Sequence, residues 1–283
     1  MTENITPTNS APSVQTLMAV GAASVQFRIT DENGKPYAIV PDNYVVKDLE
    51  HVLPAPIRKR GNIITSDSPS FIDYLTRHMT SLGSVIYADI DSENGLCFLQ
   101  AVIDDHHPEF PQWREHTCSF SPKKAVEWGR WLGNNKKQMN QSNFAAWLED
   151  NLQDVASVPN MPAGSDILAM ALAFEANADK RLRSKINLQS GGITFEFVDK
   201  ENDATRTTMQ VFERFTIGVP VFDGSARAYP VEARLKYRTA SDSVAFWYEL
   251  IRPDRVFKQA VADELASIKE ETGLLVVFGS PSL

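Results

Sequence analysis

The clearest pattern of apolar and polar residues lies between residues 215 and 268. Residues 229–238 alternate between apolar and charged side chains, which predicts a strand with one buried face and one charged face. A strand at 215–222 precedes it and ends at an Asp-Gly pair that turns readily. The strand that follows, 244–251, is apolar on both faces, which predicts a central strand covered on both sides.

The residues after these strands have the spacing of an amphipathic helix. Pro253 suits the first helical turn, Asp254 interacts favourably with the helix dipole, and Gly273 suits the C-terminal cap. Apolar residues recur at helical spacing between these ends. Residues 274–278 predict one more buried strand, so we expect an antiparallel sheet backed by this helix.

The first part of the chain is rich in predicted strands. A helix is predicted from Ser68, where a capping hydroxyl precedes a proline, and strands follow at 84–90, 96–103 and 113–120. Residues 48–64 contain two prolines and are interpreted as an extended connector.

Three helices are predicted in the middle of the chain. The first starts at Ser121, the second at Ser142, and the third at Ser165, with a basic end at residues 180–183. A strand at 193–198 then leads into the C-terminal sheet. Strands and helices are thus grouped in separate parts of the chain. This order predicts an α+β fold, in which mixed strands and a helical block precede an antiparallel sheet packed by a C-terminal helix.

Three regions follow from these patterns. Residues 1–13 are rich in Thr, Asn, Ser and Pro and are predicted to be disordered. Residues 14–160 form a mixed strand and helix region, and residues 161–283 form a helix followed by the antiparallel sheet. A length of 283 residues allows either one large core or two smaller ones, so the two regions are read either separately or as one domain.

The composition is ordinary for a globular protein, with 43% hydrophobic and 23% charged residues. The formal net charge of −8 argues against a protein that coats nucleic acid non-specifically, but it leaves room for a local basic face. The sequence starts with neither a basic segment nor a long apolar run, and no stretch approaches the ~20 apolar residues that span a bilayer. We therefore expect a cytoplasmic location, no membrane partner, and reduced thiols at Cys97 and Cys118.

Several strings of residues resemble the YfdQ-like family of phage and prophage proteins. These strings are residues 127–131 (EWGRW), 139–145 (MNQSNFA), 147–151 (WLEDN), 215–222 (FTIGVPVF) and 248–253 (YELIRP). The resemblance implies a protein made inside a bacterial host and encoded near replication or recombination genes. It implies no function, because that of the family is unknown, and it supplies no active-site residue.

Signatures of catalysis are missing from the sequence. There is no Gly-x-Ser-x-Gly elbow and no P-loop, so we predict neither catalytic residues nor a cofactor. His106, His107, His116 and Cys118 flank one predicted hairpin loop, but their spacing matches no standard zinc signature. We predict no metal site here; the alternative is a metal-dependent hydrolase built on the three histidines.

One strand face has the chemistry of a nucleic-acid-binding surface. Arg234, Lys236 and Arg238 share a face of their strand, and Trp247 of the next strand would lie beside them. Basic groups next to an aromatic ring suit single-stranded nucleic acid. The alternative is a solvated face whose charges are paired with acidic residues across the strands.

Aromatic residues of the helical block form a second candidate surface. Trp128 and Trp131 lie on one helical face, and with Phe144 and Trp147 they would form an exposed apolar strip. Aromatic anchors dominate protein interfaces, so this strip predicts self-association.

Three function classes remain open after these observations. The first is a non-enzymatic, self-associating phage or prophage accessory protein of the bacterial cytoplasm. The second is a protein of phage recombination or replication that binds single-stranded or double-stranded DNA through the basic face. The third is the metal-dependent hydrolase.

Overall fold

The computed structural model describes most of the chain from residue 53 onward. The described residues are 21, 29–30, 36–37, 50, 53–80, 83–173, 180–187, 192–199, 206–240 and 243–282. The chain divides into two compact units, Met1–Lys59 and Arg60–Leu283. Within the first unit, β1 (Ile29–Thr30) pairs antiparallel with β2 (Pro36–Tyr37). The prediction of disorder at residues 1–13 lies outside the described residues.

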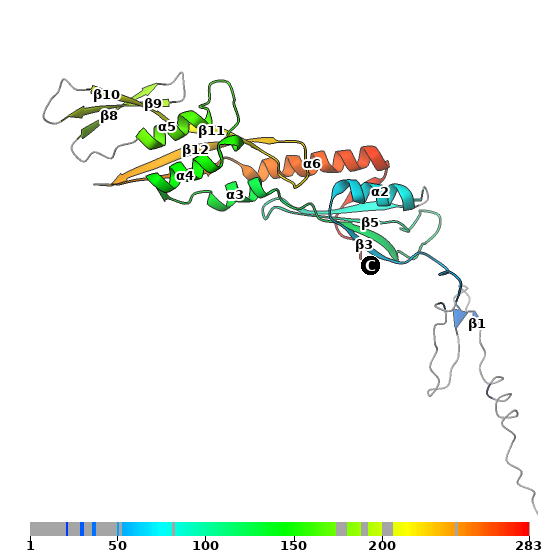
Figure 1. Ribbon diagram of the computed structural model, residues 1–283. Helices are drawn as coiled ribbons and strands as arrows, with labels where there is room; N and C mark the ends of the chain where they lie inside the picture. Colours follow the sequence, from blue (N-terminus) through cyan, green and yellow to red (C-terminus); the bar gives the residue numbers. More distant parts are fainter. Residues whose placement is uncertain are drawn as a thin grey trace, which may run out of the picture. The chain divides into compact units, whose positions relative to one another are not determined.

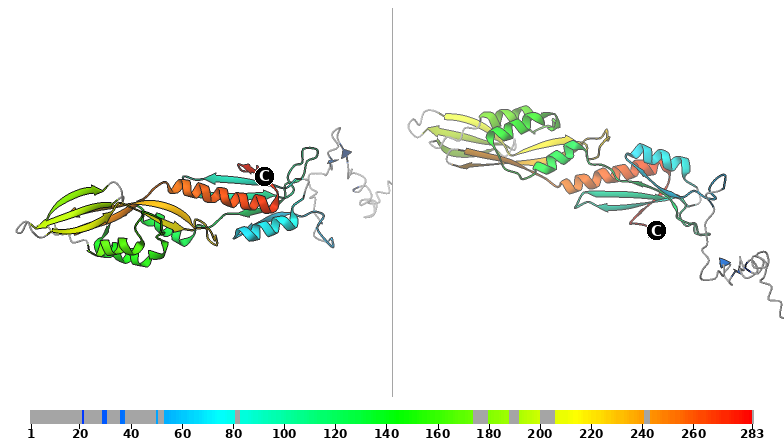
Figure 2. Two further views of the ribbon diagram at one scale, coloured as in Figure 1. Left: turned by 90° about the horizontal axis from the view of Figure 1, so that it is seen from above. Right: turned by 60° about the horizontal axis from the view of Figure 1, so that its bottom comes forward.

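A five-stranded mixed sheet forms one part of the second unit. Its strand order is β14-β4-β5-β6-β3; β4, β5 and β6 run antiparallel, while both edge strands run parallel to their neighbours. The helices α2 and α6 lie together over one face of this sheet (Figures 1 and 2). The strands and helices are β3 (Gly61–Thr65), α2 (Ser68–His78), β4 (Val85–Asp91), β5 (Leu96–Val102), β6 (His116–Phe120), α6 (Pro253–Thr272) and β14 (Leu275–Phe278).

A four-stranded antiparallel sheet forms a second part, in the order β11-β12-β13-β7. A third sheet, β10-β9-β8, is also antiparallel. These elements are α3 (Val126–Asn134), β7 (Met139–Asn140), α4 (Gln141–Asp150), the short η2 (Leu152–Asp154), α5 (Gly164–Ala173), β8 (Lys180–Asn187), β9 (Gly192–Asp199), β10 (Arg206–Phe212), β11 (Arg214–Val219), β12 (Tyr229–Ala240) and β13 (Ser243–Leu250).

The C-terminal helix contacts both of the larger sheets. The Tyr229 hydroxyl, at the start of β12, donates a hydrogen bond to Asp263 Oδ2 of α6 at 2.9 Å. The helix also contacts α2 and β14 of the mixed-sheet part. It ends at Gly273, whose positive φ of 68° is the left-handed conformation expected of a C-terminal cap. The α+β fold is thus confirmed.

An aromatic cluster joins the helical block to the antiparallel sheet. The Trp131 ring lies 4.4 Å from that of Trp147 and 5.1 Å from that of Tyr248 in β13, centroid to centroid. The Tyr248 hydroxyl donates to the Trp131 carbonyl oxygen at 2.6 Å, and the Trp131 indole N–H donates to the buried Asp154 carboxylate at 2.8 Å. Phe144 of α4 stacks on Phe246 of β13 at 5.1 Å.

These contacts correct the prediction of an exposed aromatic strip. Trp128, Trp131 and Phe144 are at most 1% exposed, and Trp147 is only partly exposed. The chain's own sheet covers these rings, so a second copy is not needed to shield them. The helical face was predicted correctly, but a buried stripe and an interface stripe have the same spacing.

Two predicted elements take a different form in the structure. The third helix ends at Ala173, and the basic residues expected at its end belong to strand β8, which pairs with β9. Strand β14 joins the mixed sheet beside β4 and is mostly exposed, with Phe278 exposed by 73%. It is therefore neither buried nor part of the antiparallel sheet.

Strand β13 is central but is covered on one face only. It lies between β12 and β7, with Phe246 and Tyr248 buried against the helices. Ala245 and Trp247 on the other face are partly exposed. The prediction that both faces are covered is wrong. Alanine and tryptophan also occur on a strand face that is only partly covered, so the apolar pattern does not distinguish two covered faces from one.

Strands β3, β7 and β10 were not predicted; β7 is a two-residue edge of the antiparallel sheet. Strand β3, in the segment interpreted as a connector, is a sheet edge whose residues are largely exposed. Strand β10 carries the chain into β11.

Within the described residues, no helix combines the length and the apolar character required to cross a membrane.

Replacing Trp131 by Phe tests the aromatic cluster. The change leaves a cavity and removes the indole donor of the buried Asp154. We expect a loss of about 2–4 kcal/mol in the free energy of unfolding, measured by denaturant titration. Trp113→Phe is the control, because Trp113 is 69% exposed, and its effect should stay within about 0.5 kcal/mol. Equal effects of the two changes would contradict the cluster's role.

Candidate functional site

The outer face of the antiparallel sheet carries the predicted basic residues. Along β12 the buried Leu235 points toward the helices, and the flanking side chains point the opposite way. Arg234, Lys236 and Arg238 are all exposed on that opposite face. In the strand register Lys236 lies directly opposite Trp247 of β13. The structure thus brings the four predicted residues together on one surface, which we call the basic face.

Acidic residues of this surface do not neutralise the basic face. Glu232 forms an ion pair with Arg214, at 2.7 Å between Nη1 and Oε1. Glu249 is the register partner of Arg234, yet it accepts a long hydrogen bond of 3.5 Å from the Trp247 indole N–H. In the part of the chain that the structure describes, Arg234, Lys236 and Arg238 have no ion pair. Charge pairing across the strands therefore does not account for these three cations.

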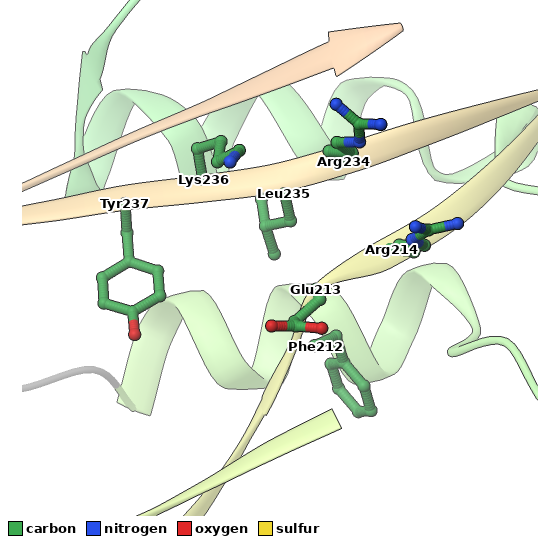
Figure 3. Close-up of a pocket in the computed structure, with 7 residues that line it drawn as sticks. All are labelled: Phe212, Glu213, Arg214, Arg234, Leu235, Lys236 and Tyr237. Atoms are coloured by element: carbon green, nitrogen blue, oxygen red, sulfur yellow. The ribbon is translucent and has the colours of Figure 1, made fainter. Parts of the chain in front are cut away.

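A pocket of about 360 Å³ opens beside the basic face. Strand β11 pairs with β12 only as far as Arg214 opposite Arg234, and one further hydrogen bond joins Leu235 N–H to the Glu213 carbonyl at 2.8 Å. At this point β11 begins, and the chain that precedes it belongs to β10 of another sheet. Strand β12 continues past this point beside β13. The pocket lies in this fork between the strands (Figure 3).

The walls of the pocket differ in chemistry. Arg234 and Lys236 project from one side of β12, and Leu235 and Tyr237 project from the other, toward Phe212 and Glu213 (Figure 3). Burial, followed by the nearby Glu213 carboxylate, raises the pKa of Tyr237 to about 12. The phenol therefore stays protonated at neutral pH and presents a neutral hydroxyl and an aromatic ring.

The sequence did not reveal Glu213, Arg214 or Tyr237 as parts of one site. Glu213 and Arg214 precede the predicted strand at 215–222, and only the register with β12 brings them beside Tyr237 and the basic face. That register depends on the length of the connection between β11 and β12. No local sequence signal fixes it.

The four residues of the predicted histidine and cysteine cluster do not converge. His106 is exposed, and His107 stacks on Phe110 at 4.5 Å. His116 is buried with its Nε2 atom 2.8 Å from the Tyr74 hydroxyl, and Cys118 is fully buried. Among the described residues no group of three or more His, Cys, Asp or Glu side chains is placed to hold a metal ion.

The loop that carries these histidines is organised by a buried carboxylate. Asp105, 5% exposed, accepts a hydrogen bond of 2.6 Å from the Tyr87 hydroxyl and forms an ion pair of 2.8 Å with Arg114. Arg114 adopts a positive φ of 57°, an uncommon conformation for a residue with a side chain. These contacts hold the loop in place and account for its polar residues structurally.

The two thiols are also placed for packing. Burial raises the pKa of Cys97 to about 12 and that of Cys118 to about 11. The thiolate is the reactive form of cysteine, so neither side chain is activated as a nucleophile at neutral pH.

Comparison with known proteins identifies the family of the chain but not an activity. A search of curated proteins found no match. The model of one protein family, described as an uncharacterized conserved protein (DUF2303), matches residues 11–281. Since this match covers nearly the whole sequence, the protein belongs to the DUF2303 family.

Proposed function

We propose that this protein binds single-stranded nucleic acid through the basic face and does not catalyse a reaction. The observation that carries the proposal is the register of β12 with β13. It sets three exposed cations, which have no ion pair among the described residues, on one face of the sheet next to the partly exposed ring of Trp247. Phosphates and bases are the ligands that this pair of features would attract.

The dimensions of the surface suit an extended strand. Alternate residues of a β-strand are about 6.6 Å apart, so the three cations span about 13 Å. A cationic row of this length can contact several successive phosphates, while the Trp247 ring offers a stacking surface for a base. Stacking on an aromatic ring contributes about 1–3 kcal/mol per base and requires unpaired bases. This contribution favours a single strand over a duplex.

A non-enzymatic role is supported by the state of the other reactive groups. Within the described residues, the buried carboxylate Asp105 is engaged in an ion pair and a hydrogen bond, and both thiols are buried. The resemblance to phage and prophage proteins further supports an accessory role in recombination or replication. We extend the proposal accordingly to a phage or prophage protein acting in the bacterial cytoplasm.

Substitution of the three cations tests the electrostatic part of the proposal. We expect Arg234→Ala, Lys236→Ala and Arg238→Ala combined to weaken binding to a labelled single strand at least about tenfold at low salt, measured by fluorescence anisotropy. The salt dependence should also flatten, since three phosphate contacts contribute a slope of about −2 in log affinity against log salt.

A matched control removes the same charge elsewhere. Arg255, Lys258 and Lys269 are exposed on α6, and replacing all three by Ala changes the net charge equally. This control should bind almost as the wild type does. Equal losses in both triple variants, or no binding by the wild type, would contradict the proposal.

Substitution of Trp247 separates stacking from charge. Trp247→Ala should weaken binding by about tenfold, because a stacking contact of about 1–3 kcal/mol is lost. The slope of affinity against salt should remain that of the wild type, since no phosphate contact is removed. A binding constant unaffected by the change would exclude Trp247 from the interface.

Self-association is a second proposal, supported by the mixed sheet. The helices cover one face of this sheet (Figure 2). On the other face the loop after β5 lies over Tyr87, and Val102, Thr117 and Ser119 are buried, so the open face is limited to the outward residues of β14 and of the first part of β5. Apolar side chains are exposed on that open face: Leu96 by 60%, Phe98 by 42%, Leu275 by 60% and Val277 by 37%. Exposed apolar groups gathered on one face are typical of protein interfaces.

The open face would form the centre of a contact with a second copy of the chain. The three strands β14, β4 and β5, about 4.8 Å apart and up to 7 residues long at about 3.3 Å per residue, give a projected area of about 330 Å². This is about half of the ~600 Å² that each partner contributes to the smallest stable interfaces, so a stable contact would include neighbouring surface. Two such faces would pack as the sheets of a β-sandwich do.

Light scattering at micromolar concentration tests this second proposal. The wild type should have the mass of a dimer or larger assembly, and Phe98→Glu should give a monomer because it places a charge in the apolar contact. Leu172→Glu is the control, since Leu172 is 63% exposed on α5, away from this sheet face. A monomeric wild type, or an assembly that persists in Phe98→Glu, would rule out this interface.

A further inference from the structure

We infer that the pocket in the fork between β11 and β12 binds one unstacked base of the bound strand, with a preference for guanine that Glu213 provides. The inference rests on the proposed binding of nucleic acid and adds a base-reading site to it.

The position of the pocket links it to the basic face. Arg214, Arg234 and Lys236 line the pocket, and the last two also belong to the basic face. A strand that follows the cations along β12 therefore passes the mouth of the pocket. Its volume of about 360 Å³ lies at the lower end of the ~300–1,000 Å³ range of small-molecule sites, which suits a single nucleotide.

The inner walls suit a planar aromatic ligand. Phe212 and Tyr237 contribute rings, and Leu235 contributes an apolar surface between the strands (Figure 3). Phe212 and Tyr237 are only partly buried, so their rings are accessible from the pocket. Stacking between aromatic or apolar side chains is the usual means by which proteins hold an unstacked base.

Glu213 determines which base the pocket prefers. It is the one acidic residue among those that line the pocket, it is exposed, and Figure 3 shows its carboxylate beneath Leu235 on the side of Tyr237. A carboxylate accepts two parallel hydrogen bonds. The Watson–Crick edge of guanine presents two adjacent donors, N1–H and the 2-amino group. Adenine and cytosine present one donor beside an acceptor, and thymine presents N3–H between two carbonyl oxygens.

The test compares single strands that differ at one position. The probes are oligothymidines of about 12 nucleotides, within the site sizes of single-strand binders, that carry thymine, guanine or hypoxanthine at the centre. The full-length wild type should bind the guanine strand about tenfold more tightly than the all-thymine strand, the size of discrimination given by a good bidentate contact. Hypoxanthine keeps N1–H but lacks the 2-amino group, so its advantage should be smaller.

Glu213→Gln should lose most of the guanine preference while keeping its affinity for oligothymidine. Glu249→Gln is the matched control, because it removes the same charge from a residue that does not line the pocket and should keep the preference. A preference that persists in Glu213→Gln, or equal binding of all three probes by the wild type, overturns the inference and leaves the proposed function standing. Failure to bind any of the probes overturns both.

Discussion

The packing of Trp131, Trp147 and Tyr248 sets the orientation of the whole antiparallel sheet. Because Tyr248 and Phe246 must face the helical block, the alternating residues of β13 must face away from it. The register with β12 passes this constraint to the next strand, where Leu235 is buried and its neighbours Arg234 and Lys236 are exposed. The basic face is therefore a consequence of the aromatic core. A one-residue slip in register would bury the cations and expose the rings.

The pocket arises from a mismatch in strand length. Strand β12 has 12 residues and β11 has 6, so β11 cannot accompany β12 to its end. Where β11 begins, the chain arrives from β10 of another sheet and leaves an opening that contains side chains from both faces of β12. A continuous sheet would keep its apolar and charged groups on opposite sides. At such a fork, both kinds of group reach the same edge. This is the physical reason that cations and aromatic rings line the same cavity.

The features of this architecture that depend on neighbouring residues were predictable from the sequence, whereas those that depend on distant residues were not. The alternation of residues 229–238 and the Pro253 and Gly273 ends of α6 have causes within a few residues, and both were predicted correctly. The parallel pairing of β14 with β4 depends on a partner distant in sequence. Trp131 shows the same limit: its helical face was evident, but a buried face and an interface have the same periodicity. Of the candidate site, the basic face was predictable, whereas Glu213 and Tyr237 required the register.

The net negative charge of the chain is compatible with a basic binding surface, because salt limits the distance over which one charge acts on another. At physiological ionic strength the field of an exposed charge decays over about 8 Å. The formal net charge of −8 is an average over 283 residues, whereas a bound phosphate responds to the groups within that distance. Arg234, Lys236 and Arg238 lie on alternate positions of one strand, so they act on the same stretch of ligand. The remaining acidic surface then opposes contacts elsewhere, which confines a polyanion to this face and makes its binding local.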